Sequence, residues 1–436
     1  MKRSFTLKSS KSKCLNGNLN VPADKSISIR ALILTSYCVG TSKIFNLLDS
    51  DDVQNTLKAL KLIGIKIEKK NNYHSVYGNG GLYKSPTQQL DLGNSGTGVR
   101  LLAGLLSTSK INVNLVGDSS LSSRPMNRII NPLNKMNIKL GSNNGYLPIR
   151  ILKDNQIFIP YKHILELGSA QVKSAILLAS LNIKGETTIL EKIQSRNHTE
   201  IMLEYLGARI ETNKNLISLK SPNCLSPNKI TVPGDFSSAA FIIVAVLITK
   251  NSNVKILNVG LNFYRTGLLD ILSKMGGTIS ISNKKTINNE LVGDIEVGTS
   301  NLKCVNTTGE ISPRMIDEFP ILFVAASFAK GKSKFNGIGE LKIKESNRLK
   351  VMHDVLKILG VDIKMGDDFI EIVGKEKYNN VKKIQTFRDH RIAMSVLVFG
   401  MASNGEITID DMSMIKTSFP GFKEIFEKIG AQIKFI

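Results

Sequence analysis

The stretch Tyr205-Leu206-Gly207-Ala208-Arg209-Ile210 carries a pattern that recurs along this chain: the end of an amphipathic helix, a turn, and then a short β-branched strand. Related stretches, usually with glycine in the turn, cover 62–67, 135–140, 205–210, 274–279, 358–363 and 428–433. The copies lie roughly 70 residues apart, with one longer interval, and a period of this length is typical of a repeated supersecondary unit. The sequence therefore predicts six copies of one unit.

A second class of helix alternates with these amphipathic ones. Its members open with small polar residues and are then apolar on nearly every side, which is typical of buried helices. We expect them over 26–38, 95–107, 169–179, 237–248, 318–329 and 389–402. Paired helices with short alternating strands disfavour a doubly wound parallel sheet. If the buried helices converge at their N-termini, their positive dipole ends would suit substrates with several negative charges.

Two proline-marked stretches, 20–23 and 231–235, are candidate crossings between domains, and they bracket three of the six units. We predict one domain over 22–235 and a discontinuous one over 1–21 plus 236–436. The N-terminal strand is expected to return to the discontinuous domain.

The composition limits the class of protein. The 436 residues suffice for two or more domains, and no apolar run reaches the roughly 18 residues of a membrane span. The N-terminal residues are rich in Lys and Ser and lack the apolar core of a secretory signal. We therefore predict a cytoplasmic enzyme with no membrane partner. The four cysteines and five histidines are scattered, so the sequence predicts neither a metal site nor a disulfide framework.

The formal net charge of +22 raises the alternative of a nucleic-acid-binding protein. The excess Lys forms no block, aromatic residues make up only 6%, and Trp is absent, so stacking platforms for bases are scarce. This alternative is remote, and we predict no nucleic-acid partner. The charge would instead favour small anionic substrates.

Polar and cationic residues gather where the buried helices are expected to start. Asp91-Leu92-Gly93-Asn94-Ser95-Gly96-Thr97-Gly98 runs into a helix whose first N–H groups suit a phosphate or carboxylate, but it lacks the Lys of a P-loop. Other groups at the starts of expected buried helices are Lys25, Ser26 and Arg30; Ser169-Ala170-Gln171; and Arg388-Asp389-His390-Arg391. Ser123-Arg124-Pro125 opens an expected surface helix, and Lys344-Glu345 places both charges side by side. Asp317 and Glu345 are candidates for general acid–base catalysis. His198 is interpreted as structural.

In combination, these motifs resemble the 5-enolpyruvylshikimate-3-phosphate synthase family. The resemblance rests on Lys25-Ser26-x-Ser28-x-Arg30, Gly93-Asn94-Ser95-Gly96-Thr97, Arg124-Pro125-Met126, Ser169-Ala170-Gln171, Lys344-Glu345-Ser346-x-Arg348 and Asp389-His390-Arg391. It implies a two-domain inside-out α/β barrel of six βαβαββ repeats, three per domain, with the active site in the interdomain cleft. It also implies transfer of the enolpyruvyl group of phosphoenolpyruvate to the 5-hydroxyl of shikimate 3-phosphate, without a cofactor or metal. We expect a monomer, because the predicted site is complete within one chain.

The resemblance also implies roles for individual residues. Shikimate 3-phosphate would be bound by Lys25, Ser26, Arg30, Ser169, Ala170, Gln171, Ser195, Asp317 and Lys344. Phosphoenolpyruvate would be bound by Lys25, Gly96, Arg124, Gln171, Arg348, Arg391 and Lys416. Asp317 would be the base on the 5-hydroxyl, Glu345 would transfer a proton at the methylene carbon, and Lys25 would complete the catalytic set.

The close alternative is the UDP-N-acetylglucosamine enolpyruvyl transferase family, which shares this fold and chemistry. That family is expected to carry a loop Cys before its Arg-Pro and an Asn after the first Lys. Here residues 117–124 contain no Cys, and Ser26 follows Lys25, so both features favour shikimate 3-phosphate as the acceptor. Sensitivity to the phosphonate glyphosate stays open.

Overall fold

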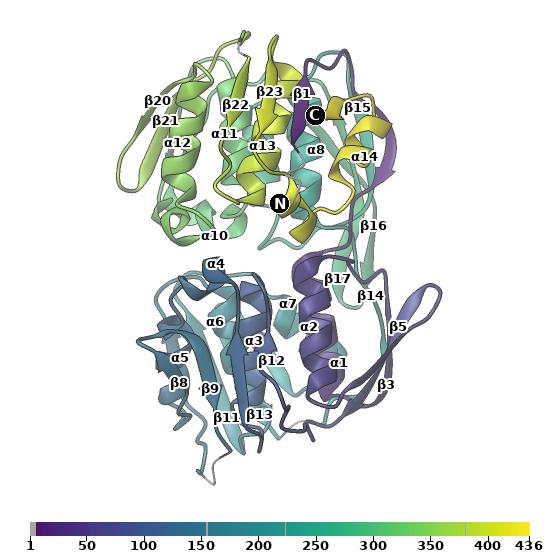
Figure 1. The fold of residues 1–436 in the computed structure, drawn as a ribbon, viewed down its shortest axis with the longest axis vertical. Helices are drawn as coiled ribbons and strands as arrows, with labels where there is room; N and C mark the ends of the chain where they lie inside the picture. Colours follow the sequence, from purple (N-terminus) through teal and green to yellow (C-terminus); the bar gives the residue numbers. More distant parts are fainter. Residues whose placement is uncertain (1–5, 154–155, 223, 380) are drawn as a thin grey trace. The chain divides into compact units, whose positions relative to one another are not determined.

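The computed structural model describes residues 6–153, 156–222, 224–379 and 381–436 (Figure 1). The chain divides into two compact units. Unit 1 contains the described residues up to Pro22 together with Pro233–Lys285 and Leu291–Ile436, and unit 2 contains Ala23–Val232 and Thr286–Glu290.

The segment Thr286–Glu290 was not expected in unit 2. It is held there by side-chain contacts: the Glu290 carboxylate lies 2.6 Å from His198 Nδ1, and the Asn288 amide exchanges two hydrogen bonds with the backbone of Thr231. These partners are distant in the sequence, so no local pattern indicates that residues 286–290 belong to unit 2. His198 is buried in this contact, in keeping with a structural role.

The described residues form six four-stranded sheets, three in each unit, and all have one topology. The first and second strands of each repeat are parallel, and the fourth lies between the second and the third. In unit 2 the sheets are β14 (Lys229–Thr231), β3 (Val39–Phe45), β5 (Tyr73–Asn79) and β4 (Lys66–Lys69); β6 (Leu90–Asp91), β7 (Val113–Val116), β9 (Tyr146–Ile151) and β8 (Gly141–Asn143); and β10 (Lys162–Leu165), β11 (Gly185–Glu191), β13 (Leu216–Ser221) and β12 (Ile210–Asn213). In unit 1 they are β2 (Asn16–Asn20), β15 (Asn253–Gly260), β17 (Glu290–Gly298) and β16 (Thr278–Ile287); β18 (Asn306–Thr307), β19 (Lys332–Asn336), β21 (Phe369–Val373) and β20 (Asp362–Met365); and β22 (Lys382–Ile384), β23 (Glu406–Ile409), β1 (Leu7–Ser10) and β24 (Gln432–Phe435).

Each repeat contributes one helix to the interior of its unit and one to the surface. The interior helices are α1 (Lys25–Tyr37), α3 (Gly96–Leu106), α6 (Ala170–Ser180), α8 (Phe236–Ile248), α11 (Phe319–Ser327) and α13 (His390–Ala402). The outer helices are α2 (Asp51–Leu62), α5 (Asn127–Asn134), α7 (His198–Tyr205), α9 (Gly267–Lys274), α12 (Arg348–Ile358) and α14 (Phe422–Lys428). Short helical turns are α4 (Ser119–Ser122), α10 (Ser312–Met315), η1 (Gly309–Ile311), η2 (Gly339–Ile343) and η3 (Ser413–Thr417). The predicted α/β fold of six βαβαββ repeats is confirmed.

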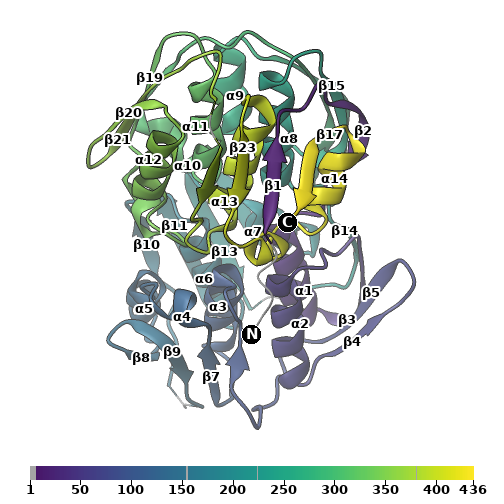
Figure 2. The same cartoon turned by 45° about the horizontal axis from the view of Figure 1, so that its top comes forward.

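Strands from distant parts of the chain complete three of the repeats. The N-terminal strand β1 supplies the last position of the sixth repeat, between β23 and β24 (Figure 2). Strand β2 pairs in parallel with β15 as the first strand of the fourth repeat. Strand β14 pairs in parallel with β3 as the first strand of the first repeat. The described N-terminal residues up to Pro22 thus belong to unit 1.

The turn after each outer helix explains the recurring hexapeptide. Its third residue has a positive φ in all six copies: Gly64 (94°), Asn137 (60°), Gly207 (88°), Gly276 (85°), Gly360 (80°) and Gly430 (101°). A left-handed residue just past the helix end caps the last carbonyl groups and turns the chain into the next strand, and glycine and asparagine tolerate this conformation best.

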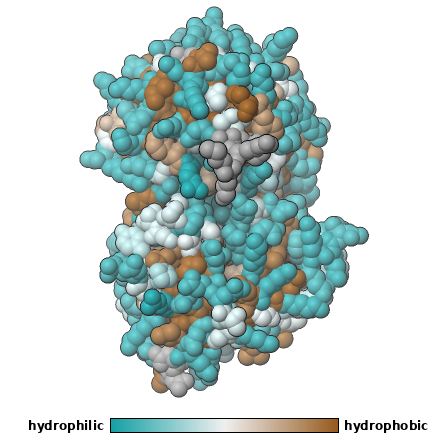
Figure 3. Space-filling view, in the orientation of Figure 1, coloured by the Kyte–Doolittle hydropathy of each residue, from teal (hydrophilic) through white to brown (hydrophobic). Residues whose placement is uncertain are grey.

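Each unit has its own apolar core around its three interior helices, which pack on one another. Helix α8 shows why: its sequence is apolar on all sides, and only its last residue is not fully buried. Hydrophilic side chains cover most of the face visible in Figure 3. In the described part of the chain, no helix is long and apolar enough to cross a membrane.

Candidate active site

In unit 2, the start of α1 brings Lys25, Ser26 and Arg30 together. Asp24 caps this helix by accepting a hydrogen bond from the Ile27 N–H. Lys25 follows it and pairs with Asp52 of α2 at 3.0 Å. Ser26 and Arg30 lie one turn apart, and the Arg30 guanidinium donates to the Ser26 hydroxyl at 2.5 Å.

Arg30 is a buried cation whose hydrogen bonds go to neutral oxygens. Its other donors reach the hydroxyls of Thr199 (2.8 Å) and Ser174 (3.1 Å), and only 2% of the residue is exposed. Burial lowers the pKa of Arg30 to about 10, although Asp24 and Glu200 oppose that shift. Because burial of a guanidinium costs free energy, a bound anion would stabilise Arg30 by placing a negative charge beside it.

A second group surrounds the start of α3. A Cβ at Gly96 would lie 3.0 Å from an Arg100 nitrogen and 3.1 Å from an Arg124 nitrogen. The Gln171 amide is fixed at both ends, because its oxygen accepts from Arg100 (2.8 Å) and its nitrogen donates to the Thr97 hydroxyl (3.1 Å). Two guanidinium groups therefore flank the start of α3, which is an arrangement suited to a phosphate.

The start of α6 and the loop before α7 carry the remaining polar residues expected in unit 2. Ser169 is the N-cap residue of α6 and Ala170 the first residue of that helix, so both lie beside its first N–H groups. Ser195 lies in the loop before α7 and donates its hydroxyl proton to Glu191 at 2.5 Å.

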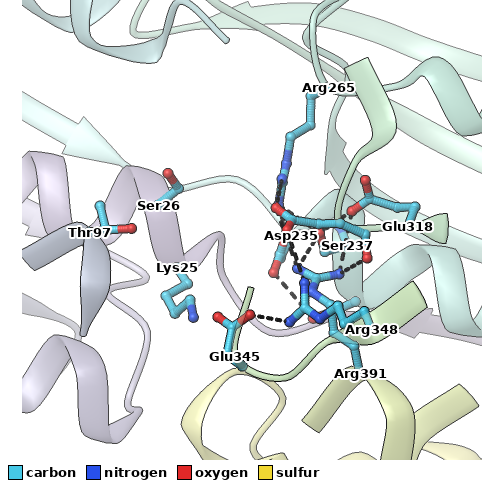
Figure 4. Close-up of polar contacts among 12 residues, drawn as sticks. Lys25, Ser26, Thr97, Asp235, Ser237, Arg265, Glu318, Glu345, Arg348 and Arg391 are labelled. Carbon is cyan, nitrogen blue, oxygen red and sulfur yellow. Dashed lines mark hydrogen bonds and ion pairs between the residues drawn. The ribbon is translucent and has the colours of Figure 1, made fainter. Parts of the chain in front are cut away.

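In unit 1, Arg348 lies at the centre of a set of carboxylates. Its guanidinium contacts both oxygens of Asp389 (2.9 and 3.3 Å) and Asp317 (3.3 Å), and the side chain is 1% exposed. It also pairs with Glu345 at 2.5 Å (Figure 4). Although burial alone would lower it, these three carboxylates raise the pKa of Arg348. Burial alone would raise the pKa of Asp389, but the positive charge of Arg348 outweighs burial and lowers it.

Arg391 points at the same carboxylate of Asp317 from the start of α13. It donates to the Asp317 backbone carbonyl (2.8 Å) and to the Ser237 hydroxyl (3.0 Å), and it lies 3.9 Å from the Asp317 carboxylate. Arg265 reaches the same carboxylate at 3.8 Å. Three guanidinium groups thus lie within 4 Å of the Asp317 carboxylate, and Arg391 also pairs with Glu318 at 3.6 Å.

Lys344 and Lys416 complete the cations expected here. Lys344 follows η2, and burial lowers its pKa against the opposing charges of Asp317 and Glu340. Lys416 lies on η3 with its side chain exposed. The structure therefore gathers Asp317, Glu345, Arg348 and Arg391 through direct contacts, while Lys416 lies on a separate turn.

Sequence reasoning missed several residues of these clusters. Asp235 and Ser237 open α8, where Asp235 accepts from the Ser237 N–H and from Arg265, and the Ser237 hydroxyl donates to Glu318. A signal was present for them, because Pro233-Gly234-Asp235-Phe236-Ser237 has the same spacing as Pro22-Ala23-Asp24-Lys25-Ser26. Arg100 and Arg265 had no such signal, since each acts through contacts distant in sequence.

In the ranges the structure describes, no group of three or more His, Cys, Asp or Glu side chains could hold a metal ion. The four cysteines are unpaired thiols.

Comparisons with known proteins agree on one family. Residues 9–426 match the model of the family described as EPSP synthase (3-phosphoshikimate 1-carboxyvinyltransferase). The chain is 43% identical to the 3-phosphoshikimate 1-carboxyvinyltransferase of Vesicomyosocius okutanii over 98% of both chains, and 43% identical to that of Petrotoga mobilis over 95% and 97%. An EPSP synthase structure from Acinetobacter baumannii covers 99% of this chain and 100% of its own, with 38% identity and a TM-score of 0.88. The enolpyruvyl transferase NikO from Streptomyces tendae shares the fold, with a TM-score of 0.76 and 16% identity over 99% of each chain. With its six repeats and its cationic helix starts, the chain belongs to the EPSP synthase (3-phosphoshikimate 1-carboxyvinyltransferase) family.

Proposed function

We propose that this chain transfers the enolpyruvyl group of phosphoenolpyruvate to the 5-hydroxyl of shikimate 3-phosphate and releases phosphate. Family membership supports the reaction. The observation that carries the assignment of residues is the convergence of Arg348, Arg391 and Arg265 on the Asp317 carboxylate. This arrangement provides paired cations for a substrate carboxylate and a base beside them.

Shikimate 3-phosphate is assigned to the cluster in unit 2. Arg30 and Lys25 supply positive charge, while Ser26, Ser169, Gln171 and Ser195 supply hydrogen bonds, and Ala170 lies beside the first N–H groups of α6. The hydrogen bonds of the buried Arg30 to other described residues go to neutral oxygens, so an anion beside it would stabilise its charge. Asp317 and Lys344 of unit 1 are assigned to the same substrate.

Phosphoenolpyruvate is assigned to two sets of arginines. Arg124 and the α3 start at Gly96 would bind its phosphate, with Lys25, Gln171 and Lys416 also contributing. Arg348 and Arg391 would bind its carboxylate, because guanidinium groups match carboxylates in two-point geometry.

The addition step requires two proton transfers. Asp317 accepts the proton of the 5-hydroxyl as its oxygen bonds to C2 of phosphoenolpyruvate, and protonated Glu345 donates a proton to the C3 methylene. In the elimination step, Glu345 takes a proton back from the resulting methyl group as the C2–O bond to phosphate breaks. Lys25 would stabilise the negative charge on the departing phosphate.

Glu345 begins this cycle in an ion pair with Arg348. A substrate carboxylate arriving at Arg348 supplies a competing anion for that guanidinium. Displacement of Glu345 from this ion pair would let its carboxyl group carry the proton that the addition step requires.

Product analysis tests the proposal. Phosphoenolpyruvate and shikimate 3-phosphate mixed with the enzyme should give inorganic phosphate and a product that keeps its 3-phosphate, both visible by ³¹P NMR, with two vinyl protons in the ¹H spectrum. Loss of the 3-phosphate, or no reaction, would refute the assignment. We also propose that the enzyme works as a monomer, because one chain carries all the assigned residues. We further propose a cytoplasmic location and no nucleic-acid partner.

A further inference from the structure

We propose that Ser237 is a positioning residue for Arg391, because its hydroxyl keeps the Arg391 guanidinium from pairing closely with the buried carboxylate of Glu318. Ser237 lies in the first turn of α8, and Arg391 lies in the first turn of α13. The inference rests on the proposed function, which assigns Arg391 to the carboxylate of phosphoenolpyruvate.

The Ser237 hydroxyl is fully used in contacts with charged side chains. Its oxygen accepts hydrogen bonds from Arg391 at 3.0 Å and from Arg265 at 2.8 Å, and its proton goes to Glu318 (Figure 4). A hydroxyl group has one proton and two acceptor lone pairs, so these contacts fix its direction. Ser237 is 3% exposed, and water therefore competes little for them.

The backbone of Ser237 is fixed as well. Asp235 caps α8 by accepting a hydrogen bond from the Ser237 N–H at 2.9 Å. The same carboxylate oxygen accepts from Arg265 at 3.0 Å. The hydroxyl that Arg391 contacts is therefore attached to a capped helix start.

Glu318 explains why this hydroxyl matters. Its Oε1 atom accepts the Ser237 proton and lies 3.6 Å from an Arg391 nitrogen, while its Oε2 atom has no hydrogen-bond partner among the described residues. Glu318 is 0% exposed, and a buried carboxylate without a donor costs free energy. Loss of the Ser237 hydroxyl would therefore draw the Arg391 guanidinium towards Glu318.

Arg391 keeps donors for a substrate in its present position. Within the described ranges, its guanidinium donates hydrogen bonds to the Asp317 carbonyl at 2.8 Å and to Ser237. A guanidinium carries more N–H donors than these two contacts use, and the others can bind a carboxylate. A shift towards Glu318 would turn those donors to a carboxylate of the protein.

Ser237→Ala and Ser238→Ala form a matched pair. Both serines lie in the first turn of α8 and are buried, but the Ser238 hydroxyl donates to Asp235 at 3.4 Å and, among the described residues, does not contact Arg391. Initial rates of phosphoenolpyruvate consumption would give kcat and the KM of each substrate. Inorganic phosphate, which has no carboxylate, would be the competing probe at saturating shikimate 3-phosphate.

We expect Ser237→Ala to raise the KM of phosphoenolpyruvate about tenfold, the effect of one lost hydrogen bond to a charged group, and to lower kcat less than about threefold. The KM of shikimate 3-phosphate and the Ki of inorganic phosphate should change less than about twofold. Ser238→Ala should leave all four constants within about twofold of the unmodified enzyme. An equal rise in both variants, or a Ki of phosphate that weakens as much as the KM, would show a merely structural role and overturn the proposal.

Arg391→Lys separates this proposal from the one on which it depends. If Arg391→Lys leaves the KM of phosphoenolpyruvate unchanged, the assignment of Arg391 is wrong and the positioning role is overturned with it, even in an active enzyme. If Arg391→Lys raises that KM and Ser237→Ala does not, the assignment stands and only the positioning role is overturned. Adding Ser237→Ala to Arg391→Lys should cause little further rise, because both changes disturb one contact.

A second variant covers the case in which Ser237→Ala does not fold. Ser237→Cys keeps a side chain of similar size, but its thiol is a weak donor and a weak acceptor. It should show the same selective rise in the KM of phosphoenolpyruvate, and an unchanged KM would overturn the proposal.

Discussion

Replacing Arg391 by Lys tests the proposed contact with the carboxylate of phosphoenolpyruvate. Arg391 is held by the Asp317 carbonyl at 2.8 Å and by the Ser237 hydroxyl at 3.0 Å, so the plane of its guanidinium is fixed before substrate arrives. Lys keeps the positive charge, but its single ammonium nitrogen cannot donate two parallel hydrogen bonds to a carboxylate as a guanidinium does. At least one of two hydrogen bonds to the substrate carboxylate is then lost.

A hydrogen bond to a charged group contributes roughly 1.5–3 kcal/mol, and about 1.4 kcal/mol corresponds to a factor of ten. The KM of phosphoenolpyruvate should therefore rise about 10- to 100-fold in Arg391→Lys, while the KM of shikimate 3-phosphate changes little. Initial rates of phosphate release at varied concentrations of each substrate would measure both constants.

Arg265→Lys is the matched control. Arg265 belongs to the same network, through Asp235 at 3.0 Å and Ser237 at 2.8 Å, but it is assigned to neither substrate. Its replacement should leave the KM of phosphoenolpyruvate within a few-fold of the original. An unchanged KM in Arg391→Lys, or an equal rise in both variants, would refute the reasoning.

Three other predictions follow from the described contacts. Asp317→Asn should lower turnover by on the order of 100-fold or more without raising the KM of phosphoenolpyruvate, because it removes the base but not the cations around it; near-normal turnover would exclude Asp317 as the base. Gly96→Ala should raise the KM of phosphoenolpyruvate, because its Cβ would lie 3.1 Å from an Arg124 nitrogen and displace that guanidinium; steady-state rates check this, and an unchanged KM would show that the site has room for a methyl group. Burial lowers the pKa of His163 to about 4, so as the pH falls the unfolded chain binds a proton at His163 before the folded chain does, and stability is lost between about pH 6.5 and pH 4. In His163→Phe, urea unfolding should show that this loss of unfolding free energy is smaller by on the order of 2–3 kcal/mol. An unaltered pH profile of stability would contradict the prediction.

Local patterns were sufficient to predict the repeats. The hexapeptide around Gly207 combines a helix end, a left-handed residue and a β-branched strand, and each part is set by neighbouring residues. The apolar run of α8 likewise predicts burial without knowledge of its neighbours.

Contacts between distant residues could not be predicted in the same way. Arg265 joins Asp235 across 30 residues, and Glu290 reaches His198 across 92. Nothing near either residue in the sequence distinguishes it from a solvated charge. The resemblance to a family predicted roles for many residues of the two clusters, but it did not predict the groups that contact them, such as Asp52, which pairs with Lys25.

The central claim is tested most directly by phosphate release from phosphoenolpyruvate, in the presence of a chelator, with either shikimate 3-phosphate or UDP-N-acetylglucosamine as the acceptor. The proposal predicts release with shikimate 3-phosphate alone, at a rate that the chelator does not change. Release only with the nucleotide sugar would leave the fold and the two carboxylate-binding arginines in place but would contradict the roles given to Ser169, Gln171 and Asp317.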